Sequence, residues 1–190
     1  MLAYAVYESD NRVRRYAEAL AARGDQVDVI ALAAGSAPLG AEQIRGVTWH
    51  RIQRRDFKER HKWSYAWRLL RFLCVSSILL MRRHRRIRYD VVHVHNVPGF
   101  LVFAAWYPKW KGARLILDIH DIVPELFANK FGTHANNSYV RLLKAVEKAV
   151  AAFADHVIVS NPLWYETIAA FSIRFLGIRL PWLRPELGGM

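Results

Sequence analysis

Two short apolar segments of the chain each end in titratable side chains. Residues 89–96 read Tyr-Asp-Val-Val-His-Val-His-Asn, and residues 114–121 read Arg-Leu-Ile-Leu-Asp-Ile-His-Asp. A histidine can accept or share the proton of a hydroxyl nucleophile or donate a hydrogen bond to a sugar, and a nearby carboxylate can orient its ring. His120 followed by Asp121 offers this chemistry. A histidine that only caps a loop carbonyl is an equally weighted alternative.

His93 and His95 lie two residues apart, so their side chains point to the same face of a strand. This spacing also occurs in metal sites, but the sequence places no third ligand clearly, and we assign no metal. We expect His95 and Asn96 to line a ligand crevice and His93 to be buried and hydrogen-bonded. Glu125 either contacts a hydroxyl-rich ligand or caps the following turn.

The elements that must position these residues alternate between strand and helix. Apolar runs predict strands over 2–7, 26–32, 47–52, 90–95, 114–119 and 156–160. Apolar residues at helical spacing predict helices from Asp10 to Gly24, over 63–86, from Pro98 to Pro108, and over 138–153. This βαβ alternation predicts an α/β fold, a Rossmann-like, doubly wound and mainly parallel sheet with helices on both faces. The carboxyl ends of its strands would then form the crevice.

The loop between the first strand and the first helix contains Asp10, Asn11 and Arg12. The free N–H groups of a helix N-terminus there suit a phosphate group. The glycine-rich G-x-G-x-x-G pattern is absent, so the sequence gives little support for dinucleotide binding. A plain helix cap is an alternative of at least equal weight.

Positive charge is concentrated in one part of this chain of 190 residues with a net charge of +12. Residues 51–88 hold 13 Lys or Arg residues against two acidic ones. Tryptophans lie among them, so anionic lipid and nucleic acid are both candidate partners, and a solvated face is the third interpretation. We favour a membrane patch formed by Arg82, Arg83, Arg85 and Arg86. With no nucleic-acid-binding signature, we do not expect nucleic acid as a partner.

Size and apolar runs bear on where the chain works. A length of 190 residues suits one domain, and the single cysteine excludes a disulfide framework. The N-terminus lacks the basic region of a signal peptide. The uninterrupted apolar run over 72–81 is shorter than the roughly 20 residues that span a bilayer, so we expect the helix over 63–86 to pack on the sheet. A cytoplasmic chain follows as the expectation.

Five segments, taken in order, resemble one family. They are residues 10–20, 24–32, 89–96, 118–125 and 147–160, and they look like the N-terminal domain of family 4 glycosyltransferases. The resemblance implies one half of a GT-B fold, in which two Rossmann-like domains face each other across a cleft. It also implies transfer of a glycosyl group from a nucleotide sugar, as co-substrate, to a hydroxyl acceptor, with retention and without a metal or other cofactor.

The resemblance also implies roles for the candidate residues. His120 matches the cleft histidine near the reacting sugar, and residues 10–12 match the loop facing the donor phosphates. His95, Asn96, Asp121 and Glu125 would contact acceptor or sugar.

The resemblance covers residues 1–170, the acceptor-side domain, and the tail over 171–190 departs from it. We therefore expect a truncated chain that lacks the donor-binding domain and is inactive alone. The alternative is a non-catalytic membrane- or partner-binding subunit of a split glycosyltransferase. Members that act on polysaccharide or lipid-linked acceptors at the cytoplasmic membrane surface suggest a peripheral location at the inner membrane face.

Overall fold

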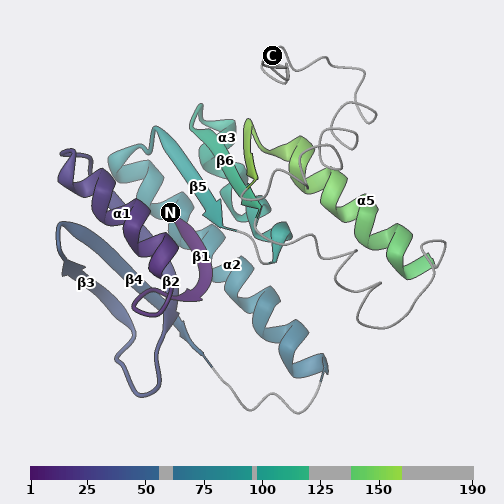
Figure 1. Cartoon of the computed structure of the whole chain (residues 1–190), viewed down its shortest axis with the longest axis horizontal. Helices are drawn as coiled ribbons and strands as arrows, with labels where there is room; N and C mark the ends of the chain where they lie inside the picture. The colour runs from purple at the N-terminus through teal and green to yellow at the C-terminus, as the bar shows by residue number, and fades with distance from the viewer. Residues whose placement is uncertain (56–61, 96–97, 120–137, 160–190) are drawn as a thin grey trace, which may run out of the picture.

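A seven-stranded sheet forms the centre of the molecule (Figure 1). The computed structural model describes residues 1–55, 62–95, 98–119 and 138–159. Within these residues the strand order is β3-β4-β2-β1-β5-β6-β7, and every neighbouring pair is parallel except β3 with β4. The strands are β1 (Leu2–Val6), β2 (Val27–Ala33), β3 (Gly40–Ile44), β4 (Val47–Arg54), β5 (Val91–His95), β6 (Arg114–Ile119) and β7 (His156–Val159).

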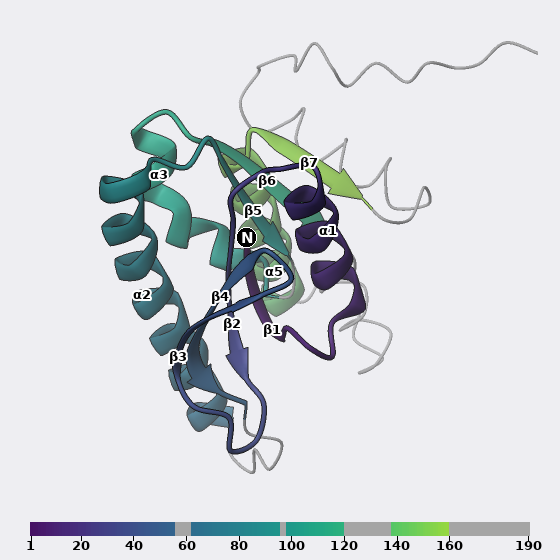
Figure 2. The same cartoon turned by 90° about the vertical axis from the view of Figure 1, so that its left-hand side faces the viewer.

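Helices cover both faces of this sheet, as Figure 2 shows edge-on. One face carries α1 (Asn11–Ala22), and the other carries α2, η1, α3 and α5. These are α2 (Lys62–Ile87), the 3₁₀ helix η1 (Gly99–Ala105), α3 (Trp106–Trp110) and α5 (Ser138–Phe153). The predicted α/β, doubly wound sheet is therefore confirmed.

Each face of the sheet has its own apolar core because side chains alternate along a strand. In β2, Val29 and Ala31 pack toward α1, whereas Ile30 and Leu32 pack toward α2. All seven residues of β2 are buried, as expected for a strand covered on both faces. The core on the α2 side is the larger of the two and includes Phe72, which is fully buried.

The long helix α2 packs on the sheet, as predicted, along one stripe of its surface. Its buried residues are Leu69, Phe72, Ser76, Leu80 and His84, which recur every three or four positions. By length and composition alone, residues Trp63–Ile87 could cross a membrane. Only 22% of the most apolar 18-residue segment of this helix is buried inside the protein, so much of its surface faces outward.

The β3–β4 hairpin was not predicted from the sequence. Its strands are antiparallel, and its turn places Arg45 at φ 50° and Gly46 at φ 80°. Positive φ at both central residues is the geometry of a type I′ turn, which usually carries Asn-Gly. Arg45 occupies the position where Asn is usual, so the sequence lacks the typical Asn-Gly pattern of this turn. All but one of the β3 residues are exposed, so no apolar alternation marked the strand either.

The predicted helix from Pro98 to Pro108 is divided into two and extends to Trp110. Residues Gly99–Ala105 form the 3₁₀ helix η1, and the α-helix α3 begins only at Trp106. Pro108 has no backbone N–H, which an α-helix tolerates only in its first turn. The proline therefore favours a helix that begins shortly before it.

Candidate functional site

The order of the strands reverses between β1 and β5, which are adjacent and parallel. β1 continues into α1 on one face of the sheet, and β5 leads toward η1 on the other (Figure 2). A crevice forms at such a switch point because the two connections leave in opposite directions. The carboxyl ends of β1 and β5 are therefore the expected position of a ligand.

The predicted loop of Asp10, Asn11 and Arg12 follows the carboxyl end of β1. The Asp10 carboxylate accepts hydrogen bonds from the backbone N–H of Arg12 at 3.1 Å and of Val13 at 3.2 Å. Asp10 is thus the N-cap of α1. Because a carboxylate already occupies these N–H groups, they are not available to a phosphate.

An open hollow of about 480 Å³ lies beside this cap. Ala5, Val6, Ser9 and residues 10–12 line it, together with Arg55. Arg55 comes directly after β4 and lies near the backbone of β1, with its guanidinium 3.5 Å from the Tyr4 carbonyl oxygen. Arg12 and Arg55 both carry positively charged guanidinium groups, so side chains of this hollow can bind an anion. Arg55 was not predicted from the sequence, where it stands as one basic residue among many.

A buried polar cluster underlies the carboxyl end of β5. His95 Nδ1 lies 3.1 Å from Asp118 Oδ2, and His93 Nε2 lies 3.8 Å from the same oxygen. His95 and Asp118 are register partners on neighbouring strands. The two histidine rings stack at 4.2 Å, and Tyr16 of α1 packs against both.

Burial defines what this cluster can do. His93, His95 and Asp118 have exposed fractions of 9%, 2% and 1%. His93 is buried as predicted, but His95 is buried more deeply, so its side chain does not lie open to a ligand. The three ligand atoms lie within 4.8 Å of one another and could hold a metal ion. A histidine–carboxylate hydrogen bond accounts for the His95–Asp118 contact without one.

The remaining site predictions concern residues that follow β5 and β6. Asn96, His120, Asp121 and Glu125 lie outside the described residues. The strands before them run parallel and side by side, and they end at His95 and Ile119. The roles assigned to these four residues stay predictions.

The predicted membrane patch is not one uniform face. Arg83 turns toward the sheet and pairs with Asp28, with Nη2 2.8 Å and Nε 3.1 Å from Oδ2. Its neighbours differ, because Arg82 and Arg86 are exposed and Arg85 donates a hydrogen bond to the Tyr107 hydroxyl at 3.2 Å. This is a correction to the predicted patch, since Arg83 serves the interior of the protein.

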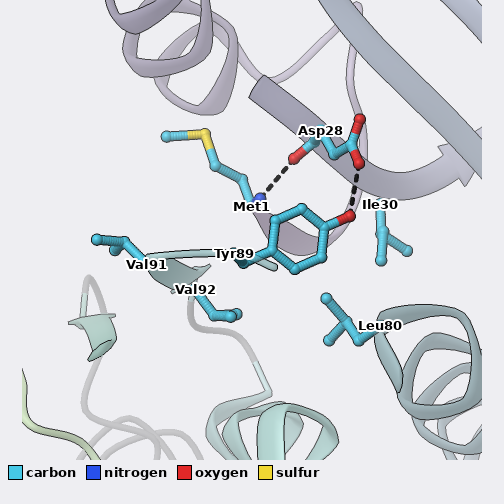
Figure 3. Close-up of a pocket in the computed structure, with 7 residues that line it drawn as sticks. All are labelled: Met1, Asp28, Ile30, Leu80, Tyr89, Val91 and Val92. Carbon is cyan, nitrogen blue, oxygen red and sulfur yellow. Dashed lines mark hydrogen bonds between the residues drawn. The ribbon is translucent and has the colours of Figure 1, made fainter. Parts of the chain in front are cut away.

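Asp28 forms a second polar centre, at the amino ends of the strands (Figure 3). The Tyr89 hydroxyl donates to its carboxylate at 2.5 Å, and the Met1 amine donates to its backbone oxygen at 2.5 Å. Burial alone would raise the pKa of Asp28. The nearby His50 ring, with Nε2 3.5 Å from Oδ1, the hydrogen bonds from Tyr89 and Arg83, and the charge of Arg83 outweigh burial and hold that pKa well below its usual range.

This centre was not predicted from the sequence, although one signal was available. Asp28 interrupts the apolar strand Val-Asp-Val-Ile over 27–30. A carboxylate inside such a strand needs partners, because an unpaired buried charge is costly. The identity of those partners depends on tertiary structure.

Comparison with known proteins settles the family. Residues 9–179 match the model of the glycosyl transferase 4-like domain. The chain belongs to this family. The resemblance to family 4 glycosyltransferases seen in the sequence is thereby confirmed, and nucleotide sugars and their acceptors are the substrates that this family suggests.

Structural comparison supports the fold of this glycosyltransferase domain. A sucrose-phosphate synthase from Thermosynechococcus elongatus matches with a TM-score of 0.55. The match covers 93% of this chain and 81% of that chain, at 17% sequence identity. At this identity the likeness concerns the GT-B-type Rossmann-like fold alone. No curated protein sequence matches the chain significantly.

Proposed function

We propose that this chain supplies the acceptor-side domain for transfer of a glycosyl group from a nucleotide sugar to a hydroxyl acceptor, with retention and without a bound cofactor. Family membership over residues 9–179 carries the proposal. The switch point between β1 and β5 supports it, because it provides a crevice at the strand ends where the candidate residues begin.

His120 is the residue we assign to assist the transfer, with Asn96, Asp121 and Glu125 contacting acceptor or sugar. The parallel ends of β5 and β6 support a common location for the residues that follow them. His95 has a narrower role than a direct contact, because it is 2% exposed and bonded to Asp118. We propose that His95 positions the residues that follow β5 in the chain.

Two arginine side chains, rather than the N–H groups at the helix N-terminus, are the candidate partners of the donor phosphates. We assign Arg12 and Arg55 to the phosphate groups, since both line the open hollow and carry positive charge. Asp10 then acts as a structural cap of α1 rather than as a phosphate ligand.

The expected setting is the cytoplasmic side of a membrane, with a polysaccharide or lipid-linked acceptor. The exposed Arg82 and Arg86 at the basic end of α2 support an anionic surface there. The same observation favours the second candidate, a non-catalytic membrane- or partner-binding subunit of a split glycosyltransferase.

A transfer and binding experiment separates these candidates. The full chain is incubated with radiolabelled nucleotide sugars and a membrane extract as acceptor, and nucleotide-sugar binding is measured in parallel by calorimetry. Robust transfer by the chain alone would contradict its expected inactivity, and a loss of about 100-fold or more in His120→Ala would then support the assigned role of that residue. Arg12→Ala and Arg55→Ala should weaken donor binding, whereas Arg15→Ala on the exposed side of α1 should not.

The outcomes are distinct. Donor or acceptor binding without transfer is expected of a transferase domain that is inactive alone, whereas vesicle binding without either favours the split-enzyme subunit. Failure to bind any nucleotide sugar or acceptor, by a chain shown to be folded by circular dichroism, contradicts the transferase proposal. An inverted product would contradict the retaining mechanism alone.

A further inference from the structure

The outward face of α2 is apolar even though it does not pack on the sheet. Trp63 is 87% exposed, Trp67 is 66% exposed, and Leu70 and Ile78 are almost half exposed. These residues recur at helical spacing on the side opposite the buried stripe that contains Phe72. A helix that is apolar on both sides is normally buried on both, so this outer stripe needs a second apolar environment.

A short neighbouring helix extends this surface. α3 lies beside α2, where the Trp106 indole N–H donates to the Ser77 hydroxyl at 3.0 Å. Trp110 is 73% exposed next to it. We name this surface the α2–α3 face and define it by Trp63, Trp67, Ile78, Arg71, Arg82 and Trp110.

The charge of the α2–α3 face has one sign. The helices α2, η1 and α3 contain no aspartate or glutamate, and Arg71, Arg82 and Arg86 are exposed on α2. A second copy of the same face would bring arginines against arginines. A neutral apolar partner would leave these charges without a counterpart. Anionic headgroups above an apolar layer match both the tryptophans and the arginines.

We propose that the α2–α3 face docks on an anionic lipid bilayer, with α2 lying in the plane of the interface. Tryptophan suits this position because its ring is apolar and its N–H is polar. Arginine suits it because its stem packs among apolar groups while its guanidinium reaches a phosphate.

The inner side of α2 shows why this helix lies on the bilayer rather than across it. Phe72 and Leu80 belong to the core of the sheet, and Arg83 is paired with Asp28. Pulling α2 into a bilayer would expose that core and separate a largely buried ion pair. The exposed stripe alone is available to lipid.

The direction of α2 sets which edge of the sheet approaches the membrane. Gln53, near the carboxyl end of β4, donates to the Arg68 carbonyl at 3.2 Å, whereas Asp28, near the amino end of β2, pairs with Arg83. α2 thus runs antiparallel to these strands, and Trp63 and Trp67 lie toward the carboxyl edge that holds the candidate site. Docking would bring an acceptor carried on a lipid to that edge, a consequence that rests on the proposed transferase function.

Vesicle sedimentation of the full chain tests the docking without any sugar substrate. We expect the chain to sediment with vesicles rich in phosphatidylglycerol and to stay in solution with phosphatidylcholine alone. The variant Arg71→Ser/Arg82→Ser should reduce the partition coefficient about fivefold for each charge removed. Trp63→Ser/Trp67→Ser should also release the chain, because it removes apolar contact without changing charge.

A matched control uses the opposite face of the sheet. Arg15→Ser/Arg23→Ser removes the same charge from exposed positions on and next to α1 and should sediment like the unchanged chain. Circular dichroism and thermal melting confirm that each variant is folded. The proposal is overturned if the unchanged chain stays in the supernatant, if the α2 variants still sediment fully, or if the control is released equally. Tight binding to a single-stranded oligonucleotide without vesicle binding would assign the face to nucleic acid instead.

Discussion

The arginines near the end of α2 show how much one helical position changes the role of a charge. Arg83 follows Arg82 directly, yet its guanidinium reaches Asp28 on β2 while Arg82 remains exposed. Successive residues on a helix are rotated by about 100°, so adjacent side chains face different surroundings. A charge run read as one patch in the sequence is therefore divided between the interior and the surface.

Replacing Arg83 and Arg86 should have unequal effects on stability. Arg83→Ser leaves the buried carboxylate of Asp28 without its charged partner and should reduce the free energy of unfolding by about 3 kcal/mol. Arg86→Ser, at an exposed position on the same turn of α2, should change it by less than about 0.5 kcal/mol. Urea unfolding followed by circular dichroism measures both free energies. Equal losses would show that the Arg83–Asp28 ion pair adds no stability beyond that of an exposed arginine.

At the scale of the element, α1 illustrates a cap that competes with a ligand. The Asp10 side chain satisfies two N–H groups at the start of the helix, the same groups that a phosphate would use. The cap also places a negative charge at the edge of the hollow that contains Arg12 and Arg55. A carboxylate at residue 10 therefore stabilises the helix but disfavours binding of an anion in the hollow.

Two substitutions at this position separate these demands. Asp10→Ala removes the cap and should cost about 1 kcal/mol of stability, whereas Asp10→Ser keeps a capping oxygen and should cost much less. Because Asp10→Ser also removes the negative charge, it should bind pyrophosphate more tightly than the unchanged chain. Thermal melting and calorimetry give the two readings, and weaker pyrophosphate binding by Asp10→Ser would contradict the assignment of the hollow to an anion.

The sequence predicted elements well where local pattern determines them. The strand over 114–119 and the helix over 138–153 have the predicted bounds, because an apolar run or a helical stripe marks each. The hairpin strand Gly40–Ile44 lacked both an apolar face and an Asn-Gly turn. Contacts such as His95–Asp118 and Asp28–Arg83 depend on strand register and helix packing, which single-sequence patterns do not contain.

Across the whole molecule, the Asp28 centre joins segments that are far apart in the chain. It connects β2 with His50 of β4, Arg83 of α2 and Tyr89. One ionised carboxylate thus links the sheet to α2, in addition to the apolar core between them. The stability of the molecule should depend on the protonation of this group.

Acid should weaken the fold through Asp28. The folded-state pKa of Asp28 lies below its usual range, so the unfolded chain binds a proton more readily than the folded chain. The stabilisation is complete above the unfolded pKa of about 4 and is lost progressively as the pH falls below that value. Urea midpoints measured from neutral pH downward should fall for the unchanged chain. Asp28→Asn should start lower and show a shallower decline, and parallel curves would contradict this account.

The hairpin strand β3 forms one edge of the sheet. An edge strand presents unpaired backbone groups that can recruit strands from other molecules. β3 has only five residues, four of them exposed, and its Glu42 forms an ion pair with Arg51 on β4. A short, polar and charged border of this kind discourages intermolecular strand pairing, so β3 protects the parallel sheet behind it from aggregation.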